Sequence, residues 1–212
     1  MSTASAWSVA LNGIEGAMVE VEVAEGGGLP RTVLVGLPDA ALSQAKERVR
    51  AAVTGAELPW PNGLVTINLS PANLPKTGTH YDLAIATAAL AAIDKVPKEA
   101  ARNHVCLGEL GLDGRLRRVP GILPALLAAV RSGFDKAIVP ASQEAEASLV
   151  PGVTVWAIGH LKDLVAVLNG EPPLGGWEPP GDDDVASRQR PPLDFREVRG
   201  HLEGRWVMEV AA

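Results

Sequence analysis

The sequence predicts an α/β (α+β) fold in which helices cover a mixed sheet, that is, an α/β sandwich. Three observations indicate this. Residues 1–70 carry several short apolar runs that read as strands, whereas strands and helices alternate from residue 81 onward. The composition, with 47% hydrophobic and 21% charged residues in 212, is typical of a globular domain. The strand-rich first half argues against a simple doubly wound fold.

The first half is expected to contain strands separated by glycine and proline turns. Alternation of apolar and acidic residues from Met18 to Glu25 is typical of a half-exposed strand. We expect a helix to begin at Asp39, a suitable N-cap residue, and to end at Gly55. The predicted strands of this half cover residues 7–12, 17–25, 32–35 and 64–69.

On the helix that follows Asp39, three basic side chains lie mostly away from the apolar face. We interpret Lys46, Arg48 and Arg50 as a solvated helix face, with contact to a polyanion as the alternative.

The second half is expected to alternate helices and strands. Leu112-Asp-Gly-Arg115 has the sequence of a tight hairpin turn. The predicted helices cover about 81–93, 121–132, 141–148 and 160–169, and the predicted strands 105–110, 137–139 and 153–157.

Composition divides the chain into three parts. Residues 1–170 form the predicted domain, and residues 171–192, rich in proline, glycine and aspartate, read as a linker. Residues 193–212 resume an apolar pattern, but twenty residues cannot bury a core of their own, so we expect them to begin a further module.

The charge and the cysteine content exclude several classes of protein. The formal net charge of −6 is not that of a general polyanion binder, although a local basic patch is compatible with it. A single cysteine, Cys106, rules out an internal disulfide and a multi-cysteine zinc site. We expect no membrane span, no secretory signal, no metal site and a cytoplasmic location.

The most informative segment runs from Asn68 to Ala86, where a strand passes through a loop rich in proline and glycine into an alanine-rich helix. Loops held at the end of a sheet often carry binding or catalytic residues, and a plain connection is the alternative. Lys76 is the loop's one basic residue. Together with the hairpin arginines Arg115, Arg117 and Arg118 it is our candidate for contacting nucleic-acid phosphate, the alternative being a hairpin edge kept charged against aggregation.

Six separated motifs then resemble, in order and spacing, the N-terminal domain of the YifB/ComM family of magnesium-chelatase-like (ChlI-type) AAA+ ATPases, over about residues 5–170. They are Gly28-Leu-Pro30, Val35-Gly-Leu-Pro-Asp39, Glu47-Arg-Val49, Asn68-Leu-Ser-Pro-Ala-Asn-Leu-Pro-Lys76, Asp82-Leu-Ala-Ile85 and Gly108-Glu-Leu-Gly-Leu-Asp-Gly-Arg115. The motif residues to which we assign a structural role are Gly36, Pro38, Asp39, Asn68, Pro75, Gly78, Asp82 and Gly114.

The resemblance implies a fold similar to the Lon protease proteolytic domain, which is shared with domain 2 of a ribosomal small-subunit protein. Comparison with the Lon motif places His80 at the position of the nucleophilic serine and Leu123 at that of the catalytic lysine. A Ser–Lys dyad needs both groups, so we expect no catalytic residue here. The domain is also similar to the non-catalytic Lon-like domain of the RadA recombination ATPase.

For the parent protein the resemblance implies a hexameric AAA+ DNA motor, a helicase for branch migration in natural transformation. The domain would then serve ring oligomerisation and contact with DNA. The resemblance implies that residues 193–212 are the truncated start of the AAA+ ATPase module, ending before the Walker A loop. ATP and Mg²⁺ are expected for the full-length parent and no cofactor for this chain. A purely structural protein-interaction domain is the alternative. A Lon-type peptidase using His80 or Thr79 is the third hypothesis.

Overall fold

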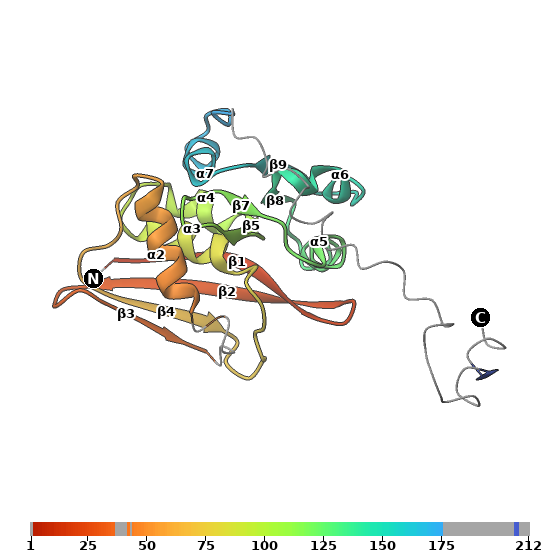
Figure 1. Cartoon of the computed structure of the whole chain (residues 1–212), viewed down its shortest axis with the longest axis horizontal. Helices are drawn as coiled ribbons and strands as arrows, with labels where there is room; N and C mark the ends of the chain where they lie inside the picture. The colour runs from red at the N-terminus through yellow and green to blue at the C-terminus, as the bar shows by residue number, and fades with distance from the viewer. Residues whose placement is uncertain (1, 37–41, 43, 176–205, 208–212) are drawn as a thin grey trace. The chain divides into compact units, whose positions relative to one another are not determined.

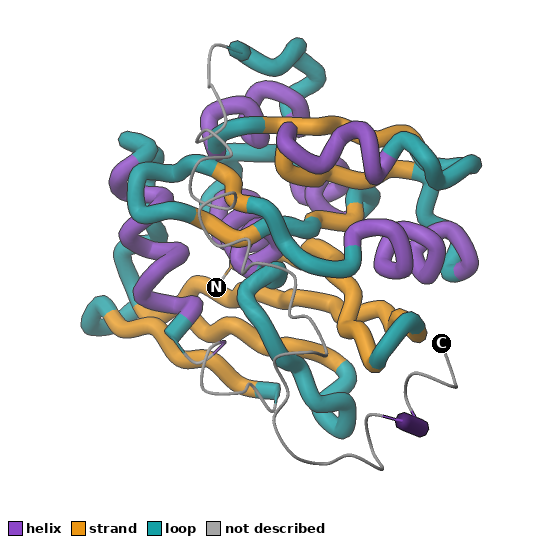
Figure 2. The backbone as a smooth tube through the Cα atoms, turned by 45° about the vertical axis from the view of Figure 1, so that its right-hand side comes forward, coloured by secondary structure: helices purple, strands orange, loops and turns teal. Residues whose placement is uncertain are grey.

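The central element of the fold is a seven-stranded mixed sheet with strand order β3-β4-β2-β1-β5-β8-β9 (Figures 1 and 2). A computed structural model describes residues 2–36, 42, 44–175 and 206–207. The chain divides into a unit of residues 1–177 and a unit of residues 178–212, and every strand of the described residues lies in the first. The strands are β1 Ser2–Asn12, β2 Glu15–Gly26, β3 Arg31–Val35, β4 Leu64–Ser70, β5 Val105–Cys106, β6 Glu109–Leu110, β7 Leu116–Arg117, β8 Lys136–Pro140 and β9 Thr154–Ile158.

The sheet is mixed because its two halves are built differently. β1, β2 and β4 pair antiparallel, whereas β3 pairs parallel with β4, and β1, β5, β8 and β9 are parallel to one another. The β1–β2 hairpin and a helical crossover from β3 to β4 build the first half, and helical crossovers connect β5, β8 and β9 in the second. This confirms the predicted α/β fold with a mixed sheet.

Helices cover both faces of the sheet. They are α2 Ala45–Gly55, α3 Asp82–Ala92, α4 Lys98–Arg102, α5 Ile122–Arg131, α6 Glu144–Ala147 and α7 Leu161–Leu168, with a 3₁₀ turn at Ala141–Gln143. α2 and α3 lie on one side of β1–β4 (Figure 1). α5 packs against the other face, where Ala128 lies beside Gly16 of β2.

Side chains alternate between the two faces of the sheet along each strand, so each face has its own hydrophobic core. On β1, Ala6 and Ala10 point into the core shared with α2 and α3, while Val9 points into the core shared with α5. The helix α3 is buried along its whole length, from Asp82 to Ala92. Its alanines allow it to lie close to the strands beneath.

One predicted element was wrong in a way that shapes the site. The expected strand 105–110 is divided between β5 in the main sheet and β6 in a separate hairpin with β7. The reason is that the backbone of Gly108 bonds to the start of α3: its N–H donates to the carbonyl of His80 (3.1 Å) and its carbonyl accepts from Leu83 N–H (3.1 Å).

Three other differences are smaller. β1 begins at Ser2, five residues before the predicted strand. The short helix α4 was not predicted. The predicted helix start at Asp39 and the motif residue Pro38 lie outside the described residues, and α2 begins at Ala45.

The segment after α7 remains attached to the domain. One carboxylate oxygen of buried Asp163 accepts the N–H groups of Leu174 (2.9 Å) and Gly175 (3.3 Å). Residues up to Gly175 are therefore tied to α7. Within the described part of the chain, no helix combines the length and apolarity needed to span a membrane.

Candidate functional site

The loop between β4 and α3 buries its only lysine. The side chain of Lys76 is fully buried, and its ammonium donates to the carbonyl oxygen of Pro71 at the start of the same loop. Burial lowers the pKa of Lys76, because an ammonium group is poorly solvated there. In this conformation Lys76 does not present its charge to solvent, so it lies apart from the exposed arginines with which it was grouped as a phosphate contact.

The next two polar residues of the loop are held by neighbouring elements. The hydroxyl of Thr79 donates to the carboxylate of Glu109 on β6. The His80 ring nitrogen Nε2 lies 2.8 Å from the carbonyl oxygen of Val9, to which it donates, and the ring lies 4.1 Å from that of Tyr81. These contacts tie the end of the loop to β6 and β1.

Arg48 and Asp82 form a buried, two-pronged ion pair between α2 and α3. Arg48 Nε lies 2.6 Å from Asp82 Oδ2, and Nη2 lies 2.8 Å from Oδ1. The Asp82 side chain is fully buried and that of Arg48 is 20% exposed. The interpretation of Arg48 as part of a solvated helix face was therefore wrong. The error arose because its partner lies 34 residues further along the chain.

Asp82 also holds the hairpin in place. Its Oδ2 accepts the backbone N–H of Leu110 at 3.2 Å, so one carboxylate joins α2, α3 and β6. Burial raises the pKa of Asp82, and the hydrogen bonds from Arg48 oppose that rise. At Arg48 the hydrogen bond to Asp82 dominates and raises the pKa of the guanidinium. We take the pair to be ionised because three hydrogen bonds converge on the carboxylate.

The hairpin β6–β7 carries the predicted nucleic-acid arginines. Glu109 and Arg117 face each other across the two strands, with Arg117 Nη1 3.9 Å from Glu109 Oε1. Arg115 Nε lies 3.5 Å from Asp113 Oδ2 in the turn. Arg115, Arg117 and Arg118 are all exposed, so the structure places these three on one surface hairpin.

The turn of this hairpin requires glycine. Gly114 has φ +85°, and a Cβ there would lie 2.7 Å from Ala56 Cβ and 3.0 Å from His160 Nε2. His160 in turn accepts from Lys162 N–H through Nδ1 and donates from Nε2 to the carbonyl of Asp113. The hairpin tip is thereby fixed against α7.

The other motif residues are placed as follows. Gly36, with φ +103°, passes so close to β4 that a Cβ would meet Leu69 O at 2.2 Å. Asn68 donates to Glu22 on β2 at 2.7 Å. Gly78 has φ +97°, and Pro75 is exposed.

The two positions compared with the Lon dyad hold groups unsuited to that chemistry. The His80 ring is used in the hydrogen bond to Val9 described above. Leu123, near the start of α5, is a partly buried apolar residue packed against the core on that face. In the described part of the chain no three His, Cys, Asp or Glu residues come together as metal ligands.

Sequence reasoning missed the roles of Arg48 and Glu109. A signal was available for both, since Arg48 lies in the motif Glu47-Arg-Val49 and Glu109 in the motif that begins at Gly108. The structure brings the side chains of these motifs together around the start of α3.

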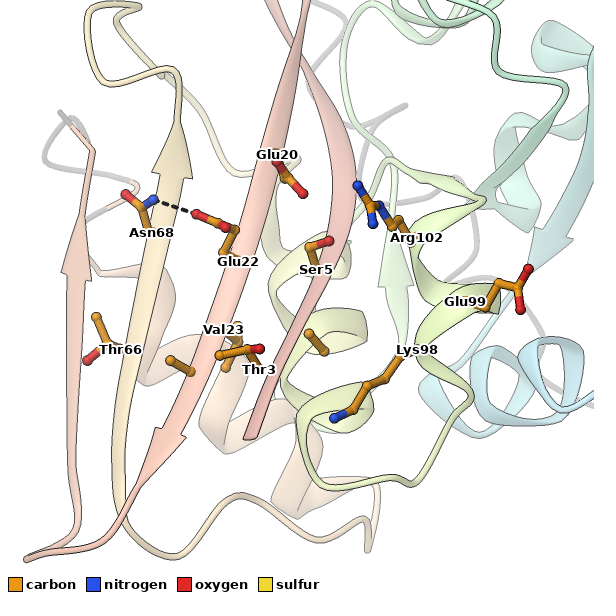
Figure 3. Close-up of a pocket in the computed structure, with 12 residues that line it drawn as sticks. Thr3, Ser5, Glu20, Glu22, Val23, Thr66, Asn68, Lys98, Glu99 and Arg102 are labelled. Carbon is orange, nitrogen blue, oxygen red and sulfur yellow. Dashed lines mark hydrogen bonds between the residues drawn. The ribbon is translucent and has the colours of Figure 1, made fainter. Parts of the chain in front are cut away.

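A separate groove of about 720 Å³ lies on the exposed face of β1, β2 and β4, beside α4 (Figure 3). Glu20 and Glu22 of β2 line one side, and Lys98 and Arg102 of α4 line the other. Lys98 donates to Ser2 Oγ at 2.9 Å. The β2 side of the groove is therefore acidic, whereas the α4 side carries two cations together with Glu99.

Comparison with known proteins now places the chain. The family model describing subunit ChlI of Mg-chelatase matches residues 19–143. The chain belongs to this ChlI family. The match includes Arg48, Asp82 and Glu109, so the ion pair and the hairpin lie within the family's shared region.

Several relatives match the ChlI-family chain along its length. An uncharacterized protein of Mycobacterium tuberculosis is 45% identical over 212 residues, which is all of this chain and 41% of the relative. Competence protein ComM of Haemophilus influenzae is 36% identical over 214 residues, covering 100% of the chain and 42% of the relative. The uncharacterized protein YifB of Escherichia coli is 36% identical over 200 residues, covering 94% and 38%. These matches confirm the resemblance to YifB and ComM, and the chain spans about two fifths of these relatives.

Two shorter matches bear on the fold. DNA repair protein RadA of Aquifex aeolicus is 36% identical over 87 residues, 41% of the chain and 18% of the relative. Lon protease 2 of Bacillus subtilis is 29% identical over 105 residues, 49% of the chain and 18% of the relative. The second is consistent with the Lon-like α/β fold.

Proposed function

We propose that this chain is the non-catalytic, Lon-like domain of an AAA+ DNA motor of the ComM type, and that it contacts DNA and helps a ring to assemble. The observation that carries the DNA contact is the hairpin β6–β7, which exposes Arg115, Arg117 and Arg118 on a rigid support. Guanidinium groups bind phosphate through paired, charge-assisted hydrogen bonds.

The loop supports a non-catalytic role. A serine- or threonine-type hydrolase needs a nucleophile beside a base that can accept its proton. Here the two positions compared with the Ser–Lys dyad hold His80, whose ring donates to the carbonyl of Val9, and the apolar Leu123. Neither residue supplies a nucleophilic hydroxyl or an amine base.

The relatives are more than twice as long as this chain, and part of our proposal concerns a protein of that length. We propose that such a protein uses ATP and Mg²⁺ and acts as a helicase in branch migration during natural transformation. The present sequence has no Gly-x-x-x-x-Gly-Lys-Ser/Thr loop to hold a nucleotide's phosphates. We propose that the nucleotide binds elsewhere in that protein, that the ring is a hexamer, and that it acts in the cytoplasm.

The test is binding of a fluorescent single-stranded oligonucleotide to the 212-residue chain at two salt concentrations. The variant Arg117→Glu/Arg118→Glu is expected to bind at least tenfold more weakly, with a shallower dependence on salt, because two phosphate contacts are lost. The control is Arg131→Glu/Lys136→Glu, which makes the same change in charge at two exposed residues outside the hairpin.

Equal losses in the two double variants would contradict a specific hairpin contact. A purely structural interaction domain is the second candidate function, favoured by Glu109 and Asp113, which partly neutralise the hairpin arginines. It would be supported by concentration-dependent oligomers that form normally in both variants, with no oligonucleotide binding.

A further inference from the structure

The carboxylate of Glu109 connects the loop to the hairpin. One oxygen accepts the hydroxyl of Thr79, and the other lies 3.9 Å from the guanidinium of Arg117. Thr79 belongs to the loop and Arg117 to the opposite strand of the hairpin. Glu109 therefore restrains two segments, at residues 79 and 117, that are 38 residues apart in the sequence.

The surroundings of Glu109 weaken its hold on these partners. Burial is the main cause that raises the pKa of Asp82, and the nearby charge of Glu109 adds to that rise. Glu109 is thus repelled by Asp82, although it is also attracted by Arg48. The Glu109 side chain is 26% exposed and that of Arg117 is 61% exposed, so water screens their attraction. An anion that binds Arg117 more strongly can therefore replace Glu109 beside it.

The loop's own cation, Lys76, is buried beneath the loop. Among the described residues, no carboxylate lies within 4.0 Å of the Lys76 ammonium, which donates to the carbonyl oxygen of Pro71. A buried ammonium group without a counter-ion is unfavourable. The flanking residues Pro75 and Thr77 are exposed, so the loop can move outward without disturbing the core.

We propose that Glu109 is a built-in competitor for nucleic-acid phosphate, which keeps the loop and the hairpin closed until a phosphate takes its place beside Arg117. This inference rests on the proposed contact with DNA and specifies its regulation. When a phosphate binds Arg117, its negative charge repels the Glu109 carboxylate. Glu109 then moves away and releases the Thr79 hydroxyl, and Lys76 becomes available as a second phosphate contact. A ligand shifts such an equilibrium because it binds the open state better than the closed one.

The decisive variant is Glu109→Gln. Glutamine keeps the size of the side chain and an oxygen that accepts from Thr79, but it removes the charge that holds Arg117. The matched control is Glu99→Gln, which removes one negative charge from an exposed residue of α4. Both are measured with a labelled 30-nucleotide oligo-dT across a series of salt concentrations.

We expect Glu109→Gln to bind about three- to tenfold more tightly than the wild-type chain, with a salt slope steeper by about 0.7 for the added single-strand phosphate contact. Glu99→Gln should change affinity by less than twofold. Equal affinities for the two variants would overturn the inference, and the proposed function would still stand if Arg117→Glu/Arg118→Glu lost binding. Failure of both the wild-type chain and Glu109→Gln to bind would overturn both, whereas binding by Glu109→Gln alone would support the inference.

Hydrogen exchange supplies a readout that does not depend on DNA. Loss of the restraint in Glu109→Ala or Thr79→Val should speed exchange of the amides in residues 76–80 several-fold, while amides of β1 keep their protection. Unchanged exchange in both variants would overturn the coupling between Glu109 and the loop.

Discussion

The Arg48 guanidinium donates hydrogen bonds to both carboxylate oxygens of Asp82, at 2.6 and 2.8 Å, and so links α2 to the first residue of α3. Asp82 also accepts Leu110 N–H, and the three elements that surround the loop therefore meet at one fully buried side chain. The loop and the hairpin take their positions from this junction.

Replacing Arg48 with alanine should destabilise the chain by about 3–5 kcal/mol, because a buried carboxylate loses its counter-ion. Arg50→Ala on the same helix removes an exposed arginine and should change the free energy of unfolding by less than about 0.5 kcal/mol. Urea unfolding followed by circular dichroism measures both. Similar values for the two variants would show that the ion pair adds no stability.

Gly114→Ala should destabilise the chain by more than Gly133→Ala. Both glycines have positive φ, +85° and +91°, which costs another residue about 1–2 kcal/mol. A Cβ at Gly114 also meets Ala56 and His160, whereas nothing lies within 4 Å of one at Gly133. Overpacking of this kind adds about 1–3 kcal/mol. Thermal unfolding compares the two, and equal melting temperatures would contradict the tight packing of the turn.

His104 should make the fold sensitive to mild acid. Burial lowers the pKa of His104 below its ordinary value, so as pH falls through about 6.5 the unfolded chain takes up a proton that the folded chain does not. The free energy of unfolding then falls with decreasing pH, by at most about 1.4 kcal/mol per pH unit for one proton. The loss continues until the folded state also binds the proton.

His104→Gln, which cannot be protonated, should show a smaller decrease in stability between pH 7 and pH 5. Urea unfolding at a series of pH values in both proteins checks this. Parallel curves would assign the acid sensitivity to other groups.

Cys106 should be unreactive in the folded protein. The thiol is fully buried, and burial raises its pKa to about 12, so almost no thiolate is present at pH 8. Iodoacetamide at pH 8 should leave the native chain unmodified and should alkylate one thiol per chain in 6 M guanidinium chloride. Rapid labelling without denaturant would show that the core around α3 opens readily.

The sequence was a good guide where neighbours in the chain decide the structure. Alternation of apolar residues located β2 and β4, and Gly55 marked the end of α2. It failed where distant segments decide. The split between β5 and β6 follows from hydrogen bonds of Gly108 to the start of α3, and the partner of Arg48 lies 34 residues away.

The candidate site shows the same division. The motifs located the loop and the hairpin, and the structure places all three hairpin arginines at the surface. Burial of Lys76 could not be foreseen, because it depends on the side chain folding back to Pro71. The link from Thr79 to Glu109 depends likewise on how the hairpin is positioned against α3.

The position of β1 has a consequence for synthesis on the ribosome. β1 and its hairpin partner β2 are synthesised before β5, and the other edge of β1 waits for β5, whose residues begin at Val105. At about 5–20 residues per second, that edge stays unpaired for roughly 5–20 s. An unpaired strand edge is a site for aggregation, so the nascent chain is most in need of chaperone protection during this interval.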